Sequence, residues 1–305
     1  MLRLFDTNEI KDAGVRATFK GESLDVTSDE EGYIEIALDG LDASLPDALT
    51  FEEMQLDLIR PGASLEGPAR PANAPILLPA KSAEFAIISD IDDTILKTGA
   101  TSLFRNLKTT FLNAVEQRIP FLGVSPFYRA LQRQGMTTPR NPIFYVSSSP
   151  WNLHDFLEDF MVLNDIPVGP MMLRDFGLDR SKLIKSGHGE HKLKAIETLL
   201  AFYPGLPFLL IGDSGQEDAS IYKTAVERHP GRIQAVYIRG LREAPERDGR
   251  ALALLAEINA LGVEALLCPD LLLAAESAAK HGWIDHADVD EVRATVLAHR
   301  ARRGA

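Results

Sequence analysis

Two kinds of hydrophobic pattern divide the chain. Before Pro61, apolar and polar positions alternate, as in Val15, Ala17 and Phe19, which is typical of half-buried antiparallel strands. From Phe85 onward, unbroken apolar runs alternate with helical patterns. This second pattern predicts a parallel sheet with helices on both faces. We therefore expect an α/β fold, a Rossmann-like domain preceded by a small β-rich domain that is sandwich-like.

The first domain and its linker are expected to occupy residues 1–75. Besides the strand at Val15, strands are predicted at residues 24–26, 34–38 and 54–58, where the alternation continues. The proline-rich stretch at residues 61–79 is interpreted as a linker. Because this region contains no cluster of reactive side chains, we assign it no chemistry.

The second domain is expected to occupy residues 76–305, with strands and helices in alternation. Strands are predicted at residues 85–91, 143–147, 171–174, 208–212 and 233–238. Helices are predicted at residues 103–117, 126–134, 151–163, 192–202 and 218–227. After Gly249 the pattern predicts a further helix, an edge strand at residues 263–267 and two more helices.

An acidic sequence closes the first buried strand. The run FAIISDIDDT places Asp90, Asp92 and Asp93 at the carboxyl end of that strand, where open α/β sheets bind ligands. Carboxylates gathered there repel one another without a cation, so the pattern predicts a site for a hard cation, most simply Mg²⁺. Residues two apart in a strand point to the same side. Asp90 and Asp92 are therefore expected to face the pocket, whereas Asp93 is expected to be structural or to lie behind the residues that contact the ligand.

Hydroxyl groups follow the second strand of the predicted sheet. Ser147, Ser148 and Ser149 come at the end of IFYV, and their hydroxyl and backbone N–H groups can bind anionic oxygens. Ser149 precedes Pro150 and is interpreted as a turn or helix cap. Together with Thr94, which follows the acidic motif, Ser147 and Ser148 are predicted to bind substrate.

A lysine and two further aspartates complete the predicted site. Asp213 ends the strand FLLIG, Asp218 follows at the start of a helix, and Lys192 opens the helix before that strand. Carboxylates, hydroxyls, an ammonium and a metal at one edge predict a phosphoryl-transfer site. One of Asp90 and Asp92 would attack phosphorus to give an acyl phosphate, and the other would carry the proton.

Four motifs together resemble a known superfamily. In order and spacing, SDIDDT, YVSSSP, HK and GDSGQED are similar to the motifs of the haloacid dehalogenase-like (HAD-like) hydrolases. More narrowly, ISDIDDTIL, NPIFYVSSSPWNL, GPMMLRD and LIGDSGQED resemble the catalytic domain of the Mg²⁺-dependent phosphatidate phosphatases associated with actin patches, and of their bacterial relatives. The resemblance covers residues 85–284. It implies a HAD-like fold and a phosphatidate phosphatase that uses Mg²⁺.

The resemblance also implies a role for each matching residue. Asp90 corresponds to the nucleophile and Asp92 to the general acid and base. Ser147 corresponds to the residue that binds phosphate. The motif lysine corresponds to Lys192 by pattern, with two neighbouring lysines, Lys185 and Lys194, as alternatives.

The same resemblance implies a set of metal ligands. Mg²⁺ would be held by the Asp90 carboxylate, the Asp92 carbonyl oxygen and the Asp213 carboxylate. Asp218 would lie behind these ligands or contact a metal-bound water.

Composition limits the setting in which this chemistry takes place. The chain has 305 residues, and its net charge of -12 argues against general binding of nucleic acid, because phosphate backbones repel such a surface. Cys268 is the only cysteine, which excludes intramolecular disulfides and suits a reducing cytosol. The first residues lack the basic and apolar pattern of a secretory signal. We therefore expect a cytoplasmic protein that can make peripheral contact with a membrane.

The spacing of the motifs bears on the substrate. Members of the resembled superfamily differ mainly in a cap inserted between the motifs. Because the gap here between Thr94 and Ile143 is too short for a large α/β cap, the resemblance implies an open site that admits a bulky substrate. Residues 103–111 combine Phe104 and Phe111 on one helical face that could meet a lipid surface, or pack in the core. The family resemblance implies phosphatidate as the leading substrate. The alternatives are a phosphoprotein, nucleotide or small metabolite with the same chemistry, and a noncatalytic adaptor that binds phospholipid.

Overall fold

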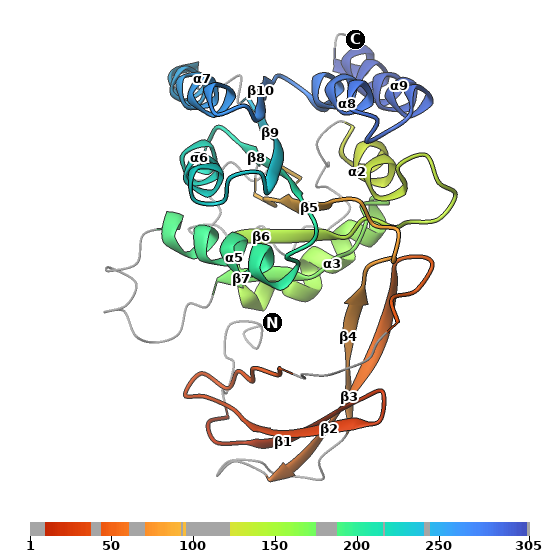
Figure 1. The fold of residues 1–305 in the computed structure, drawn as a ribbon, viewed down its shortest axis with the longest axis vertical. Coiled ribbons are helices and arrows are strands. Elements are labelled where there is room, and N and C mark those ends of the chain that lie inside the picture. The colour runs from red at the N-terminus through yellow and green to blue at the C-terminus, as the bar shows by residue number, and fades with distance from the viewer. Residues whose placement is uncertain are drawn as a thin grey trace. The chain divides into compact units, whose positions relative to one another are not determined.

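The chain divides into two compact units, residues 1–81 and 82–305. The computed structural model in Figure 1 describes residues 10–37, 44–60, 71–92, 94–95, 123–174, 188–215, 217–240 and 245–303. Each unit is built around its own sheet. No helix in this described part of the chain combines the length and the apolar composition needed to cross a membrane.

The first unit contains a four-stranded antiparallel sheet. Its strands are β1 (Gly14–Phe19), β2 (Glu22–Thr27), β3 (Thr50–Arg60) and β4 (Ala72–Leu78), in the order β2-β1-β3-β4. Ala17, Phe19 and Met54 form a small buried cluster on one face. The predicted alternation of buried and exposed positions is therefore confirmed for the strands that carry these residues.

The strand predicted at residues 34–38 is not observed. Residues 33–37 have no regular secondary structure, and Leu38 lies outside the described residues. The side chain of Ile36 nevertheless packs against the buried cluster of the sheet. The alternation in this segment reflects burial of a side chain without strand pairing. Because the described residues of this unit form a single sheet, the second layer of the expected sandwich is not found among them.

The predicted linker at residues 61–79 is also partly wrong. Residues 61–70 lie outside the described part, but residues 72–78 form strand β4, which pairs with β3. Pro75 lies opposite Glu53 in this pairing. A proline is tolerated there because β4 is an edge strand, where one side of the backbone has no neighbouring strand to bond. The proline-rich composition predicts a linker, but residues 72–78 form an edge strand.

The second unit contains a six-stranded parallel sheet, as the sequence predicts. Its strands run in the order β10-β9-β8-β5-β6-β7, and every adjacent pair is parallel. The bounds are β5 (Ala86–Ser89), β6 (Ile143–Pro150), β7 (Met171–Arg174), β8 (Phe208–Asp213), β9 (Ile233–Arg239) and β10 (Glu264–Cys268). All residues of β5 and β8 are buried, because helices cover both faces of the sheet.

The helices form a layer on each face of this sheet (Figure 1). One layer contains α5 (His188–Phe202), α6 (Asp218–Arg228) and α7 (Pro245–Ala260). The other contains α2 (Val124–Arg133), α3 (His154–Leu163), α8 (Leu271–Lys280) and α9 (His286–Arg303), which share one core cluster with the sheet. A short 3-10 helix, η3 (Trp151–Leu153), leads into α3.

Most of the predicted elements of this unit are confirmed to within a few residues. The edge strand predicted at residues 263–267 is β10, and two helices follow it. Strand β6 continues to Pro150 instead of ending at Ser147. The helix predicted at residues 103–117, including the apolar face at residues 103–111, lies outside the described residues.

Candidate active site

The predicted site residues meet at the carboxyl edge of the parallel sheet. Strand β5 lies between β6 and β8 in the sheet order. Asp90 directly follows β5, Ser147 lies near the end of β6, and Asp213 is the last residue of β8. Parallel strands end at the same edge, so three distant sequence motifs become neighbours.

A buried cluster of opposite charges lies at the centre of this edge. The Nζ atom of Lys192 is 2.9 Å from Asp90 Oδ1 and 2.7 Å from Asp218 Oδ1. The side chains of Lys192, Asp90 and Asp218 are 3%, 1% and 0% exposed. Lys192 lies on helix α5, and its ammonium forms an ion pair with each of the two carboxylates at this edge of the sheet.

Asp218 also contacts the strand that carries Asp213. The backbone N–H of Asp213 donates to Asp218 Oδ2 at 3.2 Å, and Asp218 is the first residue of α6. A Cβ atom at Gly212 would lie only 2.5 Å from the same Asp218 oxygen. Glycine is therefore required at position 212 for the carboxylate to approach the backbone.

The charges in this cluster are not balanced by the lysine. Burial is the main cause that raises the pKa of Asp90, and the carboxylates of Asp218, Asp213 and Asp92 raise it further against the opposing effect of Lys192. Burial lowers the pKa of Lys192, but attraction by Asp218 and Asp90 outweighs it, and the pKa is raised overall. The ammonium stays charged, while its carboxylate neighbours favour further positive charge.

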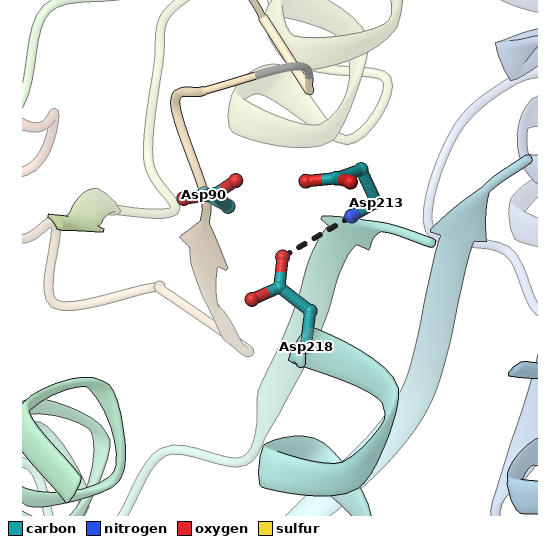
Figure 2. A group of neighbouring side chains, drawn as sticks. All are labelled: Asp90, Asp213 and Asp218. Carbon is teal, nitrogen blue, oxygen red and sulfur yellow. Dashed lines mark hydrogen bonds between the residues drawn. The ribbon is translucent and has the colours of Figure 1, made fainter. Parts of the chain in front are cut away.

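Three of the carboxylates are arranged as a metal site would require. Asp90, Asp213 and Asp218 each offer an oxygen, and these oxygens lie within 4.8 Å of one another (Figure 2). All three residues are buried, and the Lys192 ammonium that contacts Asp90 and Asp218 carries a single positive charge. An all-oxygen, anionic donor set fits a hard divalent cation. The cluster can thus hold a metal ion.

Asp92 has a separate environment formed by hydroxyl groups. Its Oδ2 atom accepts hydrogen bonds from Ser147 Oγ at 2.6 Å and from Ser149 Oγ at 2.8 Å. The Oγ atom of Ser147 in turn accepts a hydrogen bond from the Ser149 backbone N–H at 2.8 Å. These two hydroxyl donors fix the orientation of the Asp92 side chain. Asp92 is partly buried, so protons can reach it from solvent.

The contact made by Ser149 was missed in the sequence analysis, which gave this residue the role of a turn or cap. The spacing of the two serines could have indicated this contact. Ser147 and Ser149 are two residues apart in a strand, so their side chains point to the same side. Ser148 lies between them, and its buried Oγ atom has no hydrogen-bond partner among the described residues. Ser148 therefore does not join the other two serines on Asp92.

The remaining predicted residues take different places. Thr94 is buried, and its Oγ1 donates to Asp90 Oδ2 at 3.4 Å. Of the three candidate lysines, Lys192 contacts the acidic cluster, Lys194 is exposed, and Lys185 lies outside the described residues. Asp93 also lies outside them.

The loop that follows Asp213 is tied to α7. Gly215 donates its backbone N–H to Asp213 Oδ1, and its carbonyl oxygen accepts a hydrogen bond from Arg247 Nη1 at 2.7 Å. Ser214 Oγ donates to Asp248 Oδ1. These bonds hold the loop at the sheet edge and orient the Asp213 carboxylate toward the cluster.

Comparisons with known proteins identify the same region. A sequence profile described as "Phosphatidate phosphatase APP1, catalytic domain" matches residues 85–240. The phosphatidate phosphatase APP1 of Saccharomyces cerevisiae is 32% identical over 170 residues, which cover 53% of this chain and 27% of the yeast protein. An uncharacterized protein of Schizosaccharomyces pombe is 30% identical over 155 residues, which cover 50% of this chain and 25% of that protein. The chain thus matches about a quarter of the length of each relative.

Proposed function

The chain belongs to the family of the phosphatidate phosphatase APP1 catalytic domain, and from this we propose that it is a Mg²⁺-dependent phosphatidate phosphatase working through an aspartyl-phosphate. The observation that carries the proposal is the buried cluster of Asp90, Lys192, Asp213 and Asp218 within the matched residues. The four motifs and the sheet order also support the proposed membership of the HAD-like superfamily.

Asp90 is the proposed nucleophile. One of its carboxylate oxygens attacks phosphorus and forms an O–P bond, while the bond from phosphorus to the ester oxygen of the lipid breaks. Lys192 contacts the same carboxylate at 2.9 Å and holds it in place, and its positive charge attracts the phosphate. This step produces diacylglycerol and a phosphoryl group on Asp90.

Asp92 is the proposed proton carrier. It donates a proton to the leaving alkoxide and then takes a proton from the water that attacks phosphorus. Attack by water breaks the bond between phosphorus and the Asp90 oxygen, releases inorganic phosphate and restores the carboxylate. The hydrogen bonds from Ser147 and Ser149 keep Asp92 oriented through both steps.

The proposed phosphate-binding groups come from two strand ends. Thr94 already contacts Asp90, and the backbone N–H groups of Ser147 and Ser148 and the Ser148 hydroxyl lie on the neighbouring strand. Ser147 would bind phosphate through its backbone N–H, because its hydroxyl hydrogen is donated to Asp92. Groups aimed at the oxygens of phosphate lower the barrier most when they are fixed before the substrate arrives. We include all three residues in the proposed substrate-binding set.

The proposed metal ligands are Asp90, Asp213 and the carbonyl oxygen of Asp92, with Asp218 supporting them. Asp218 fits this supporting role because both of its oxygens contact neighbouring groups, Lys192 and the Asp213 N–H. When bound, Mg²⁺ would neutralise charge on the phosphate oxygens. The excess of buried negative charge in the cluster is the structural reason to expect it.

Removing divalent cations should abolish turnover. A chelator is expected to stop phosphate release, and Mg²⁺ is expected to restore it. Asp213→Asn should raise the Mg²⁺ concentration that gives half-maximal rate by roughly 10–100-fold, a range seen when the environment of a metal is perturbed. The same substitution at the exposed Asp155 is the matched control. Full turnover in the presence of the chelator would rule out the proposed metal dependence.

Phosphatidate should be the preferred substrate among phosphomonoesters. Initial rates of phosphate release would be compared for phosphatidate in mixed micelles, a phosphopeptide, a nucleoside monophosphate and a sugar phosphate, all with Mg²⁺. Faster hydrolysis of a soluble monoester would contradict phosphatidate as the preferred substrate, but it would leave the proposed phosphatase mechanism intact. Binding of phosphatidate without turnover of any substrate would instead indicate a noncatalytic adaptor.

A further inference from the structure

A chain of buried hydrogen bonds ends on the backbone of Asp90. The Oγ atom of Ser89 donates to the carbonyl oxygen of Asp90 at 2.7 Å and lies 2.7 Å from the hydroxyl oxygen of Tyr128. A serine hydroxyl has one hydrogen, and here it is directed to Asp90. The Tyr128 hydroxyl is therefore the donor to Ser89. The chain runs in one direction, from α2 through Ser89 to Asp90.

A second tyrosine acts on the other main-chain group of Asp90. The Asp90 N–H donates to the carbonyl oxygen of Ile211 at 2.9 Å. The hydroxyl of Tyr222, from α6, donates to that same oxygen at 2.9 Å. Helices α2 and α6 cover opposite faces of the sheet (Figure 1). The backbone of Asp90 is thus connected to a tyrosine from each helical layer.

These hydroxyl groups are shielded from water. Ser89 and Tyr128 are 0% exposed, and Tyr222 is 2% exposed. Burial raises the pKa of both phenols, so each keeps its proton and remains a donor. A buried hydrogen bond costs more to lose than an exposed one, because water cannot replace the missing partner.

We propose that Tyr128, acting through Ser89, and Tyr222, acting through Ile211, are positioning residues that aim the Asp90 carboxylate at phosphorus. The inference rests on the proposed function, in which Asp90 is the nucleophile. The backbone angles of Asp90 determine where its carboxylate lies. Because a displacement of about 1 Å can cost roughly 10²-fold in rate, hydrogen bonds that fix the N–H and carbonyl of this residue affect the chemical step. They do not touch the substrate.

Tyr128→Phe removes one hydroxyl and keeps the ring. We expect kcat for phosphatidate to fall roughly 10-fold with KM unchanged, because binding groups stay in place while the nucleophile is less well aimed. Ser89→Ala should have the same effect. Adding Tyr128→Phe to Ser89→Ala should cause no further loss, because the tyrosine acts only through the serine. Tyr222→Phe should also lower kcat without changing KM.

Tyr237→Phe is the matched control. The buried hydroxyl of Tyr237 donates to Ser277 Oγ at 2.9 Å, and Ser277 Oγ donates to Glu264 Oε2 at 2.8 Å. This tyrosine and serine repeat the arrangement of Tyr128 and Ser89, but they lead to Glu264. The control should lose a similar amount of thermal stability and keep the wild-type kcat.

Each outcome of the kinetic comparison is decisive. Wild-type kcat in Tyr128→Phe and Ser89→Ala would overturn the positioning role and leave the proposed function intact. An equal loss of kcat in Tyr237→Phe would also overturn it, because the effect would then follow general stability. Absence of turnover by the wild-type protein on every phosphomonoester would overturn both the proposed function and this inference.

Discussion

Asp90→Asn should reduce phosphatidate turnover by roughly 10⁴-fold or more, a loss typical of removing a covalent nucleophile. The amide keeps the shape of the side chain, and its oxygen can still accept the hydrogen bond from Lys192. The change also removes one negative charge from a buried cluster in which carboxylates outnumber the ammonium. We therefore expect the fold to be retained, with a melting temperature at or above that of the wild type in the absence of a divalent cation.

Asp155→Asn provides the comparison for this variant. Asp155 lies on α3 and its side chain is 98% exposed, so the same chemical change should leave the rate unchanged. Turnover near the wild-type rate in Asp90→Asn would eliminate the aspartyl-phosphate mechanism. Loss of activity together with unfolding would show instead that Asp90 is needed for structure.

Lys192→Met should abolish turnover and also destabilise the second unit. The lysine is the group in direct contact with both Asp90 and Asp218, and removing one partner of a buried ion pair leaves uncompensated charge. Such losses cost about 3–5 kcal/mol of unfolding free energy. Methionine fills similar space, so the loss would come from charge and hydrogen bonding more than from packing. Denaturant unfolding in the absence of a divalent cation measures it.

Lys194→Met is the matched control for this second change. It lies two residues further along α5, and its side chain is exposed. The Lys194→Met variant should have the same rate of turnover and the same free energy of unfolding as the wild type. If Lys192→Met unfolds at the same denaturant concentration as Lys194→Met, the lysine does not hold the acidic cluster together.

Much of the second unit could be predicted because its patterns are local. Buried strands read as unbroken apolar runs, and parallel strands place their carboxyl ends at one edge. These two rules predict from the sequence alone that Asp90, Ser147 and Asp213 lie together at that edge. The choice of Lys192 over Lys194 rested on motif resemblance, and the structure gives a physical basis, since one side chain is buried and the other exposed.

The parts that were missed depend on contacts between distant segments. Ser149 is interpreted from the proline that follows it, although its partner Asp92 lies 57 positions earlier in the sequence. Tyr128 resembles any apolar residue on a buried helical face, and only the fold shows that its hydroxyl reaches Ser89. Hydrogen-bond partners of this kind cannot be derived from periodicity.

The errors in the first unit have a related cause. The prolines around β4 indicated a linker, but an edge strand tolerates proline because one side of its backbone is unpaired. Ile36 alternates with polar residues because its side chain is packed against the sheet, although its backbone forms no strand. The alternation of apolar and polar residues indicates which side chains are buried. Whether a segment pairs as a strand depends on which other segments lie beside it.

The cluster around Lys192 connects the proposed chemistry with the stability of the fold. The same ammonium contacts the proposed nucleophile and Asp218, and Asp218 contacts the backbone of the proposed metal ligand Asp213. A change at any of these residues should therefore alter both turnover and unfolding. Measuring the two properties side by side distinguishes loss of chemistry from loss of structure.

The most direct test of the proposed aspartyl-phosphate mechanism is to locate the phosphoryl group during turnover. Two proteins would be compared, the wild type and Asp92→Asn, in which the attacking water would lack its proposed base. Each would be mixed with Mg²⁺ and phosphatidate that carries a radiolabelled phosphate, then quenched in acid and digested. The aspartyl-phosphate mechanism predicts label on the peptide that contains Asp90, and no label in Asp90→Asn. Label on a different residue, or hydrolysis of phosphatidate with no labelled peptide in either protein, would contradict it.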